Sequence, residues 1–398
     1  MSISLNMMTN LGIMLLTGLL LGRLMKQLGF PNVSGYILAG LVLGPYLLPA
    51  LGCPFSILSE GFINGISLIT DVALGLIAFS IGGQLRFSEL VKAGPAPVIL
   101  ALTESLLAAV CVGGVMIACG KGPGMAMVLG SIAAATGPAA TILVVQQYRA
   151  RGKATTLLLQ IVALDNMIAL LLYSISISVI KHFGAEGKKI FYAILKELLR
   201  LLEGAGLGVL LAVVMLFALR FFRRREYRMT FVCGILFLGL GLAQKYGLNG
   251  LIVCMMMGVA VSNLSVDADE IVEAAEPIAA PVFVLFFVAS GAGLPVNLLR
   301  SVLTFGIIYI AARYGGKILG MLLGAKIAKT DRRQCMYTGL SLLPQAGIAT
   351  GLALSAGSIL PESASDIRAI VLTGTLICEL IGPAVTRVSL KAAGEIRD

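Results

Sequence analysis

The sequence predicts an all-α integral membrane protein with about 13 transmembrane helices, arranged as two inverted repeats that each contain a broken helix. Three observations predict this fold: the composition, the number of long apolar stretches, and two interrupted stretches at matching positions. Of the 398 residues, 58% are hydrophobic and only 13% are charged, whereas about 25% of the residues in a soluble domain are charged. Because a soluble protein could not cover so much apolar surface, the composition excludes a soluble enzyme, a disordered chain and a nucleic-acid-binding module.

Thirteen stretches approach the length of about 20 apolar residues that a transmembrane helix needs. Several of them contain Gly or Pro, which a helix bundle tolerates because neighbouring helices satisfy the freed backbone groups. The single histidine and the lack of any CxxC pair among the seven cysteines exclude a zinc site, an HExxH protease and a His-containing catalytic triad. The predicted spans are residues 4–22, 33–50, 64–84, 95–119, 124–146, 155–180, 199–221, 229–243, 248–263, 277–294, 301–324, 335–358 and 367–388.

Basic residues gather in the connections on one side of the predicted bundle. The net charge is +10, from 30 Lys and Arg against 20 Asp and Glu, and most of the Lys and Arg residues lie in connections that follow odd-numbered spans. The positive-inside rule then places the N-terminus outside and the C-terminus in the cytoplasm. Two longer connections are predicted to form amphipathic helices, residues 181–200 outside and the acidic residues 264–276 inside. The acidic segment is either a solvated linker or a region that attracts cations or senses pH.

Six charged residues away from the ends of the predicted spans are candidates for a function, because a charge at a helix centre costs roughly 2.5–3.5 kcal/mol. At 1.5 Å per residue, Asp165 is about 18 Å and Lys317 about 14 Å from the inner face, so both lie near the midplane and can pair. For Asp71 and Glu379, a structural hydrogen bond to a neighbouring helix and a transport role both remain open. The full set is Asp71, Glu104, Asp165, Arg313, Lys317 and Glu379.

Two predicted spans are interrupted at their centres. The fifth contains Thr136-Gly137-Pro138, and the twelfth contains Pro344-Gln345-Ala346-Gly347. Proline removes a backbone N–H and disrupts the bond to residue i−4, and the adjacent glycine favours unwinding. Either span alone could be a Pro-kinked structural helix. With the seventh span as a linker, however, each break falls on the fifth span of its half, which points to an inverted-repeat transporter with its site between the halves.

These residues resemble those of the cation/proton antiporter superfamily, in the branch of bacterial sodium/proton antiporters and potassium-efflux antiporters. The likeness covers nearly the whole chain. It rests on the order and spacing of GYILAGLVLGP at residues 35–45, LGLIAFSIGGQL at 74–85, ATGP at 135–138, VALDN at 162–166, GKILG at 316–320 and LPQAG at 343–347. The resemblance implies the sodium/proton antiporter fold, in which the two broken helices cross near the ion site, in a homodimer of the plasma (bacterial inner) membrane.

The resemblance also implies a division into a scaffold and a core that moves like an elevator to give alternating access. Spans one to three, residues 1–93, would form scaffold and dimerisation helices, and spans four to six, residues 94–182, core transport helices. Residues 183–296 would supply the linker and further scaffold helices of spans seven to ten. Residues 297–398 would complete the core with spans eleven to thirteen.

The sixth span departs from the family pattern at one position. Electrogenic relatives carry Asp-Asp there and electroneutral relatives usually carry Asn-Asp, whereas this chain has Asp165-Asn166. In the family the second position is the main ion ligand and the first pairs with the lysine. The resemblance therefore implies that the Asp165–Lys317 pair is kept, while an amide replaces the usual ion-binding carboxylate.

Cation/proton exchange needs a group that binds either a proton or a cation, and a buried carboxylate suits this role. We expect Asp165 to be the titrating acid, with Asn166, Thr136 and carbonyls near Gly137 as neutral oxygen ligands of a monovalent cation. Lys317 would compensate Asp165 when no cation is bound. The second carboxylate candidate is Glu104, and the residues that would shape the crossing are Pro138, Pro344, Gln345 and Glu379.

The sequence thus predicts a transporter, not an enzyme, that exchanges Na+, K+ or Li+ for H+ and serves pH homeostasis. It predicts no cofactor, membrane lipids as surroundings, no nucleic-acid partner and no appended nucleotide-binding domain. Exchange would be electroneutral if Asp165 acts alone, and electrogenic if Lys317 also gives up a proton. The alternative, favoured by Asn166, is a transport-impaired, channel-like or sensor relative of the antiporters. An intramembrane protease has little support, because no GxGD motif is present.

Overall fold

The computed structural model describes most of the chain, and the fold below refers to that part. The described residues are 6–28, 32–50, 52, 56–138, 141, 144–145, 148–181, 187–222, 224–293, 299–345, 347–357 and 359–396. Ala346, within the second predicted break, lies outside them.

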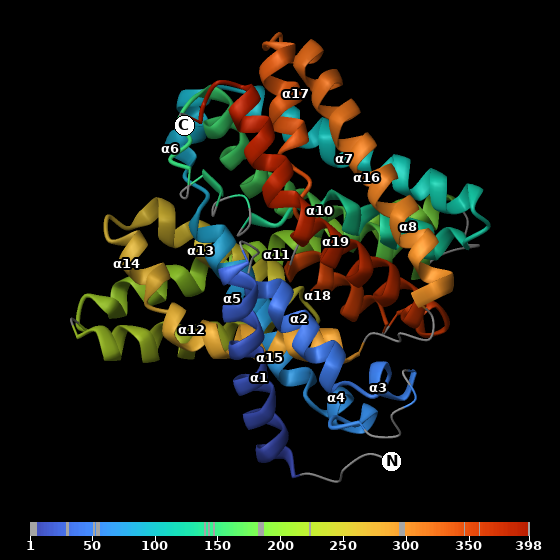
Figure 1. Cartoon of the computed structure of the whole chain (residues 1–398). Coiled ribbons are helices and arrows are strands. Elements are labelled where there is room, and N and C mark those ends of the chain that lie inside the picture. The colour runs from blue at the N-terminus through green and yellow to red at the C-terminus, as the bar shows by residue number, and fades with distance from the viewer. Residues whose placement is uncertain are drawn as a thin grey trace.

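The described part is helical nearly throughout (Figure 1). A helix lies in each of the thirteen stretches that the sequence marks as spans. The elements are α1 Met7–Gln27, α2 Asn32–Leu43, α3 Leu47–Ala50, α4 Glu60–Gly65, α5 Ser67–Gly83, α6 Phe87–Ala93, α7 Ala96–Ala118, α8 Pro123–Ala134, α10 Lys153–Lys181, α11 Gly187–Leu219, α12 Arg225–Tyr246, α13 Gly250–Leu264, α14 Ala268–Glu273, α15 Glu276–Ala292, α16 Leu299–Ile327, α17 Arg332–Leu340, α18 Gly347–Ala356, the 3-10 turn Pro361–Ser363 and α19 Ala364–Ala392.

Within the described residues, six helices are long and apolar enough to cross a membrane on their own: α1, α7, α10, the Leu195–Leu219 part of α11, α12 and α16. The bent helix α19 makes a seventh if its two parts are one span. Several of the others are shorter apolar helices, among them one from each interrupted span, α8 and α18. The all-helical membrane fold is therefore observed, and the count of thirteen spans stays a prediction.

The structure corrects the prediction that residues 181–200 form an amphipathic helix separate from the seventh span. Helix α11 runs for 33 residues from Gly187 to Leu219 without a break, so the second half of residues 181–200 continues directly into the seventh span. Neither a proline nor a capping motif interrupts this stretch of sequence, and a helix continues until such a signal ends it. The acidic inner connection forms the short helix α14.

The helices pack as two groups. Helices α1, α2, α5, α11, α12, α13, α14 and α15 pack on one another, while α7, α8, α10, α16, α17, α18 and α19 form the second group. The groups meet where α10 packs on α11, where α5 packs on α18 and where α2 packs on α19. In Figure 1, α7, α8, α16 and α17 of the second group lie at the top and upper right, and α1, α3 and α4 lie at the bottom.

Helices α7 and α16 approach each other closely because glycine faces the contact. A Cβ atom at Gly316 would lie 2.7 Å from the Cα of Ala108, and one at Gly320 would overlap the backbone of Glu104. Only a residue without a side chain permits this approach. The two glycines flank Lys317, so this packing brings Lys317 beside Glu104.

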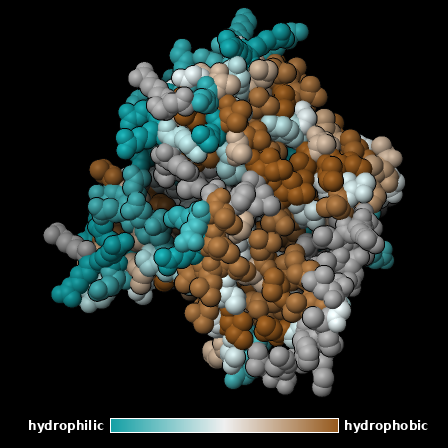
Figure 2. Space-filling view, in the orientation of Figure 1, coloured by the Kyte–Doolittle hydropathy of each residue, from teal (hydrophilic) through white to brown (hydrophobic). Residues whose placement is uncertain are grey.

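The surface has the character of a membrane protein. Figure 2 shows a broad hydrophobic area over the α7 and α16 region and the lower centre of the molecule. Hydrophilic residues gather at the top and left, around the C-terminal end, α6 and α14. Exposed leucine, valine and phenylalanine side chains on α1 and α11 belong to the same kind of surface, which lipid tails can cover.

Candidate ion-binding site

The first broken span unwinds in the middle of the core. Helix α8 ends at Ala134, and Ala135 is extended, with φ −65° and ψ 139°. The N–H of Gly137 donates to the carbonyl oxygen of Pro344 at 2.9 Å. The fifth and twelfth spans therefore touch at their breaks, and Pro138 follows directly after this contact.

The second broken span unwinds over Ser341–Gln345, between α17 and α18. Gln345 is fully buried, and its Nε2 donates to the Tyr309 hydroxyl oxygen at 2.8 Å and to the Ile132 carbonyl at 3.2 Å. This amide ties the second break to α8 and α16. Both interruptions thus lie at the proline and glycine positions that the sequence indicates.

Asp165 and Asn166 lie on α10, completely buried beside the first break. The Nδ2 of Asn166 donates to the carbonyl oxygens of Thr136 at 3.0 Å and Val162 at 2.9 Å. Three buried side-chain oxygens here have no hydrogen-bond partner among the described residues: Asp165 Oδ1, Asn166 Oδ1 and Thr136 Oγ1. One carboxylate and two neutral oxygens are ligands that a small hard cation accepts.

Lys317 joins two carboxylates to the end of a helix. Its Nζ donates to Glu104 Oε2 at 2.7 Å, to the Ala134 carbonyl at 2.8 Å and to Asp165 Oδ2 at 3.4 Å. Lys317, Glu104 and Asp165 are all completely buried. The structure thus brings the expected pair together, but the shorter contact is to Glu104, which also accepts from the Ser105 hydroxyl at 2.9 Å.

Arg313 joins the two breaks, a role that the sequence alone does not assign to it. The buried guanidinium lies one helical turn before Lys317 and donates to carbonyl oxygens of both breaks. The two interrupted spans in the sequence indicate such a role, because unwound spans free carbonyls that need hydrogen-bond donors in a membrane interior. The acceptors are Ala135 at 2.8 Å, Leu343 at 2.9 Å, Ala133 at 3.0 Å, and Leu342 and Pro344 at 3.4 Å.

The other two span acids lie in different surroundings. Glu379 on α19 is 1% exposed. Asp71 on α5 is exposed on the surface of the chain, so the structure does not bring it to the breaks. The sequence leaves the same two roles open for both acids, and the structure distinguishes them because Glu379 is buried and Asp71 is exposed.

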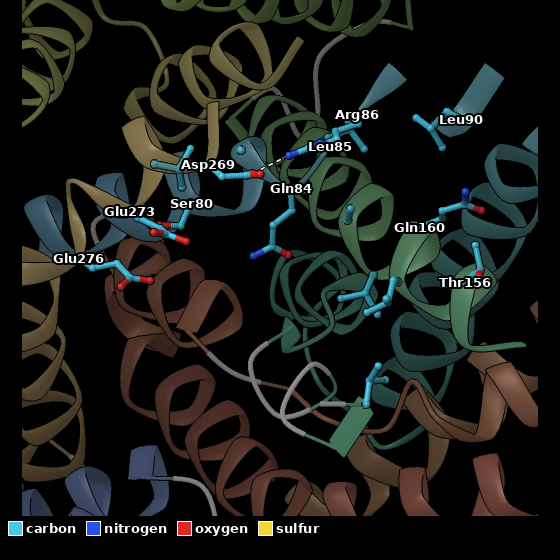
Figure 3. A pocket seen from close by; sticks show the side chains of 16 residues that line it. Ser80, Gln84, Leu85, Arg86, Leu90, Thr156, Gln160, Asp269, Glu273 and Glu276 are labelled. Atoms are coloured by element: carbon cyan, nitrogen blue, oxygen red, sulfur yellow. Dashed lines mark hydrogen bonds and ion pairs between the residues drawn. The ribbon is translucent and has the colours of Figure 1, made fainter. Parts of the chain in front are cut away.

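A cavity of about 620 Å³ approaches the site between the two groups of helices. Gln84 and Arg86 line it at the end of α5, while Thr156 and Gln160 line it on α10 (Figure 3). It reaches Ala163, two residues before Asp165 on the same helix. The wall contributed by α14 and α15 is acidic, with Asp269, Glu273 and Glu276, of which Asp269 accepts a 2.6 Å hydrogen bond from Arg86.

Comparisons with known proteins agree with this architecture. A family model described as "Sodium/hydrogen exchanger, transmembrane" matches residues 12–391. The Na(+)/H(+)-K(+) antiporter GerN of Bacillus cereus is 23% identical over 377 residues, which cover 92% of this chain and 93% of GerN.

Two solved structures of the sodium proton antiporter MjNhaP1 from Methanocaldococcus jannaschii share the fold. The structure at pH 8 superposes with a TM-score of 0.81 at 19% identity, over 98% of this chain and 99% of that one. An electron-microscopy structure gives a TM-score of 0.74 at 21% identity, over 98% of each chain. The predicted sodium/proton antiporter fold, with its two broken helices, is confirmed by these likenesses.

Proposed function

Since the chain belongs to the transmembrane sodium/hydrogen exchanger family, we propose that it exchanges a monovalent cation for a proton at Asp165, across the plasma membrane. The observation that carries the proposal is the state of this carboxylate. Asp165 is completely buried, one of its oxygens faces Lys317 at 3.4 Å, and the other has no partner among the described residues. A buried carboxylate with one free oxygen can accept either a proton or a cation, and Lys317 stabilises it when neither is bound.

The neutral ligands of the cation are Asn166 and Thr136, together with the backbone at Gly137. Their side-chain oxygens are buried without partners in the part of the chain described. A cation that binds there replaces its hydration shell with protein oxygens. Pro138 and Pro344 keep the breaks open, and Gln345 and Glu379 shape the crossing.

Oxygen ligands of this kind accept sodium, potassium or lithium. The relative GerN is named a Na(+)/H(+)-K(+) antiporter, which supports sodium or potassium as the transported ion. A single proton exchanged for one such cation moves no net charge, so exchange is electroneutral when Asp165 acts alone. The ion and the proton are substrates, and the protein works without a cofactor.

Alternating access arises from movement of the core, residues 94–182 and 297–398, against the scaffold, residues 1–93 and 183–296. The cavity at the Lys153 end of α10 lies between α10 of the core and α5, α14 and α15 of the scaffold. Further towards the start of α5, Leu74 packs directly on Gly351 of α18. An elevator-like shift would open this contact and close the cavity. The N-terminus lies outside, the C-terminus lies in the cytoplasm, and two copies associate through their scaffolds in the lipid bilayer.

A second function, a transport-impaired or channel-like sensor, is favoured by one observation. The Asn166 amide group is held by two hydrogen bonds to backbone carbonyls, at 2.9 and 3.0 Å, as a purely structural residue would be. In that case Asp165 remains paired with Lys317 and no proton is exchanged.

Transport by purified protein in acid-loaded vesicles separates the two functions. Addition of Na+, K+ and Li+ in turn should raise the internal pH for at least one ion, at a rate that does not respond to an imposed membrane potential. Asp165→Ala should reduce the signal to that of empty vesicles, whereas Asp71→Asn, a change of an exposed acid, should leave it unchanged. No pH change in the wild type with any ion supports the sensor, and a voltage-dependent rate contradicts electroneutral exchange.

A further inference from the structure

The charges buried in the described part of the core do not cancel. Three are acids and two are bases, so the interior carries one net negative charge when all of them are ionised. The set is Glu104, Asp165, Glu379, Arg313 and Lys317. A net charge in a membrane interior is costly, and either one proton or one monovalent cation removes it.

Glu379 is the acid that no base in the described chain contacts. Lys317 contacts Glu104 and Asp165, and Arg313 donates only to backbone carbonyls. Among the described residues, the elements that pack on α19 bring no other buried charge to it. Helix α16 supplies the two bases and the tyrosines 309 and 314, and α2, α8 and α18 contain no charged residue. The arginines of α17 and Glu362 of the 3-10 turn Pro361–Ser363 are exposed. The Oε1 of Glu379 has no hydrogen-bond partner among the described residues.

The same acid lies beside the second break. On α19, Gly382 and Thr386 follow Glu379 by one and two helical turns on one face. A Cβ at Gly382 would lie 2.9 Å from the ring of Pro344, and the Thr386 hydroxyl donates to the Ser341 carbonyl at 3.2 Å. This face therefore covers the unwound segment whose Pro344 carbonyl contacts the first break.

A proline inside α19 leaves one more oxygen beside Glu379 without its usual hydrogen-bond donor. Pro383 has no N–H for the carbonyl of residue i−4, which is Glu379, and α19 bends by 46° here. The backbone carbonyl and the carboxylate of the same residue are thus both without their usual helical or ionic partners. Thr375, one turn earlier, also has a buried hydroxyl with no partner in the part of the chain described.

We propose that Glu379 is the second carboxyl of the exchange, which holds the proton while the core is free of cation and releases it when a cation binds at Asp165. The inference rests on the proposed exchange function and keeps the cation at Asp165, but it places the exchanged proton on Glu379 instead of on Asp165. Asp165 is ionised beside Lys317, and Glu379, with no base in contact, is neutral. When a cation enters at Asp165, the proton leaves Glu379 to the solvent, and the sum of charges stays at zero. One proton exchanges for one cation, which keeps the cycle electroneutral.

Glu379→Gln tests this because it fixes the residue in its neutral form. The sum of buried charges is then zero before the cation binds and +1 afterwards, so cation affinity should fall on the order of tenfold or more. Cation-dependent proton release from purified protein in weakly buffered detergent should disappear. Glu379→Asp keeps the carboxyl group and should retain the release, and Asp71→Asn is the matched control at an exposed acid.

Infrared difference spectra give a readout that does not require transport. Addition of the cation should remove a band of a protonated carboxyl group from the wild type and from Asp71→Asn, and Glu379→Gln should lack that band. Proton release in Glu379→Gln equal to the wild type, or an unchanged carboxyl band, would overturn the role of Glu379 while leaving the exchange function intact. Wild-type protein that shows the Glu379 band on a pH step, but no exchange with any ion, would contradict the exchange function instead.

Discussion

Replacement of Arg313 by lysine tests whether this guanidinium holds the two breaks together. Arg313 is completely buried and makes three short hydrogen bonds, to the carbonyls of Ala135, Leu343 and Ala133 at 2.8, 2.9 and 3.0 Å. Lysine keeps the charge but carries its donors on one nitrogen and lacks the planar fork that reaches several acceptors. We expect one or two of these carbonyls to lose their donor.

The cost of this change follows from the number of carbonyls left unpaired. A buried polar group without a partner costs about 1–3 kcal/mol, so Arg313→Lys should lose about 1–6 kcal/mol of stability. Arg313→Met leaves all three carbonyls without a donor, at about 3–9 kcal/mol, which approaches the 5–15 kcal/mol that typically stabilises a fold. We expect this second variant not to accumulate as folded protein.

Thermal melting of the purified protein in detergent measures the effect, with the folded fraction followed by size-exclusion chromatography. Arg313→Lys should melt several degrees below the wild type. The control is Arg333→Lys, because Arg333 is exposed and surface substitutions change stability by less than about 0.5 kcal/mol. If Arg313→Lys has the same melting temperature as the control, or if Arg313→Met is as stable as the wild type, the guanidinium does not join the breaks.

Two further predictions concern the ends of helices. The Glu395 carboxylate accepts from two backbone N–H groups at the start of α10 and from the Thr155 hydroxyl, at 2.7–2.8 Å, so Glu395→Ala should cost about 1–2 kcal/mol, as loss of a helix cap does. Gly152→Ala should have a similar effect in the same melting assay, since its Cβ would overlap that carboxylate; a stable Gly152→Ala would contradict the capping role. In contrast, Asp269→Asn removes an exposed ion pair with Arg86 and should cost less than about 1 kcal/mol, with a difference that shrinks as salt is added.

The sequence predicts the membrane fold well because its signals are local. Apolar stretches mark the helices, and a proline with a glycine within three residues marks both breaks. The depth of Asp165 and Lys317 along their spans is enough to bring the two into one layer of the membrane. These properties depend on position along a helix, which can be counted from the sequence.

What the sequence does not predict is the rotation of each helix about its axis. Asp71 and Glu379 look alike as single acids in apolar stretches, yet one is exposed and the other is 1% exposed. The short contact between Lys317 and Glu104 depends on the close approach of α7 and α16 at Gly320. Such pairings join residues more than 200 positions apart, and no periodicity within one span contains them.

The two buried bases of the core, Arg313 and Lys317, both donate hydrogen bonds to backbone carbonyls at the crossing of the breaks. Helices α8 and α17 both end at the crossing, and a helix C-terminus carries a partial negative charge from its unpaired carbonyls. Arg313 donates to carbonyls at both ends, and Lys317 donates to the last residue of α8, Ala134. Arg313 and Lys317 partly neutralise the negative ends of these helices. Less of their positive charge is therefore left to balance the three buried acids. This shortage gives the interior its affinity for one more positive charge, and we infer that a proton and a metal cation compete to supply it.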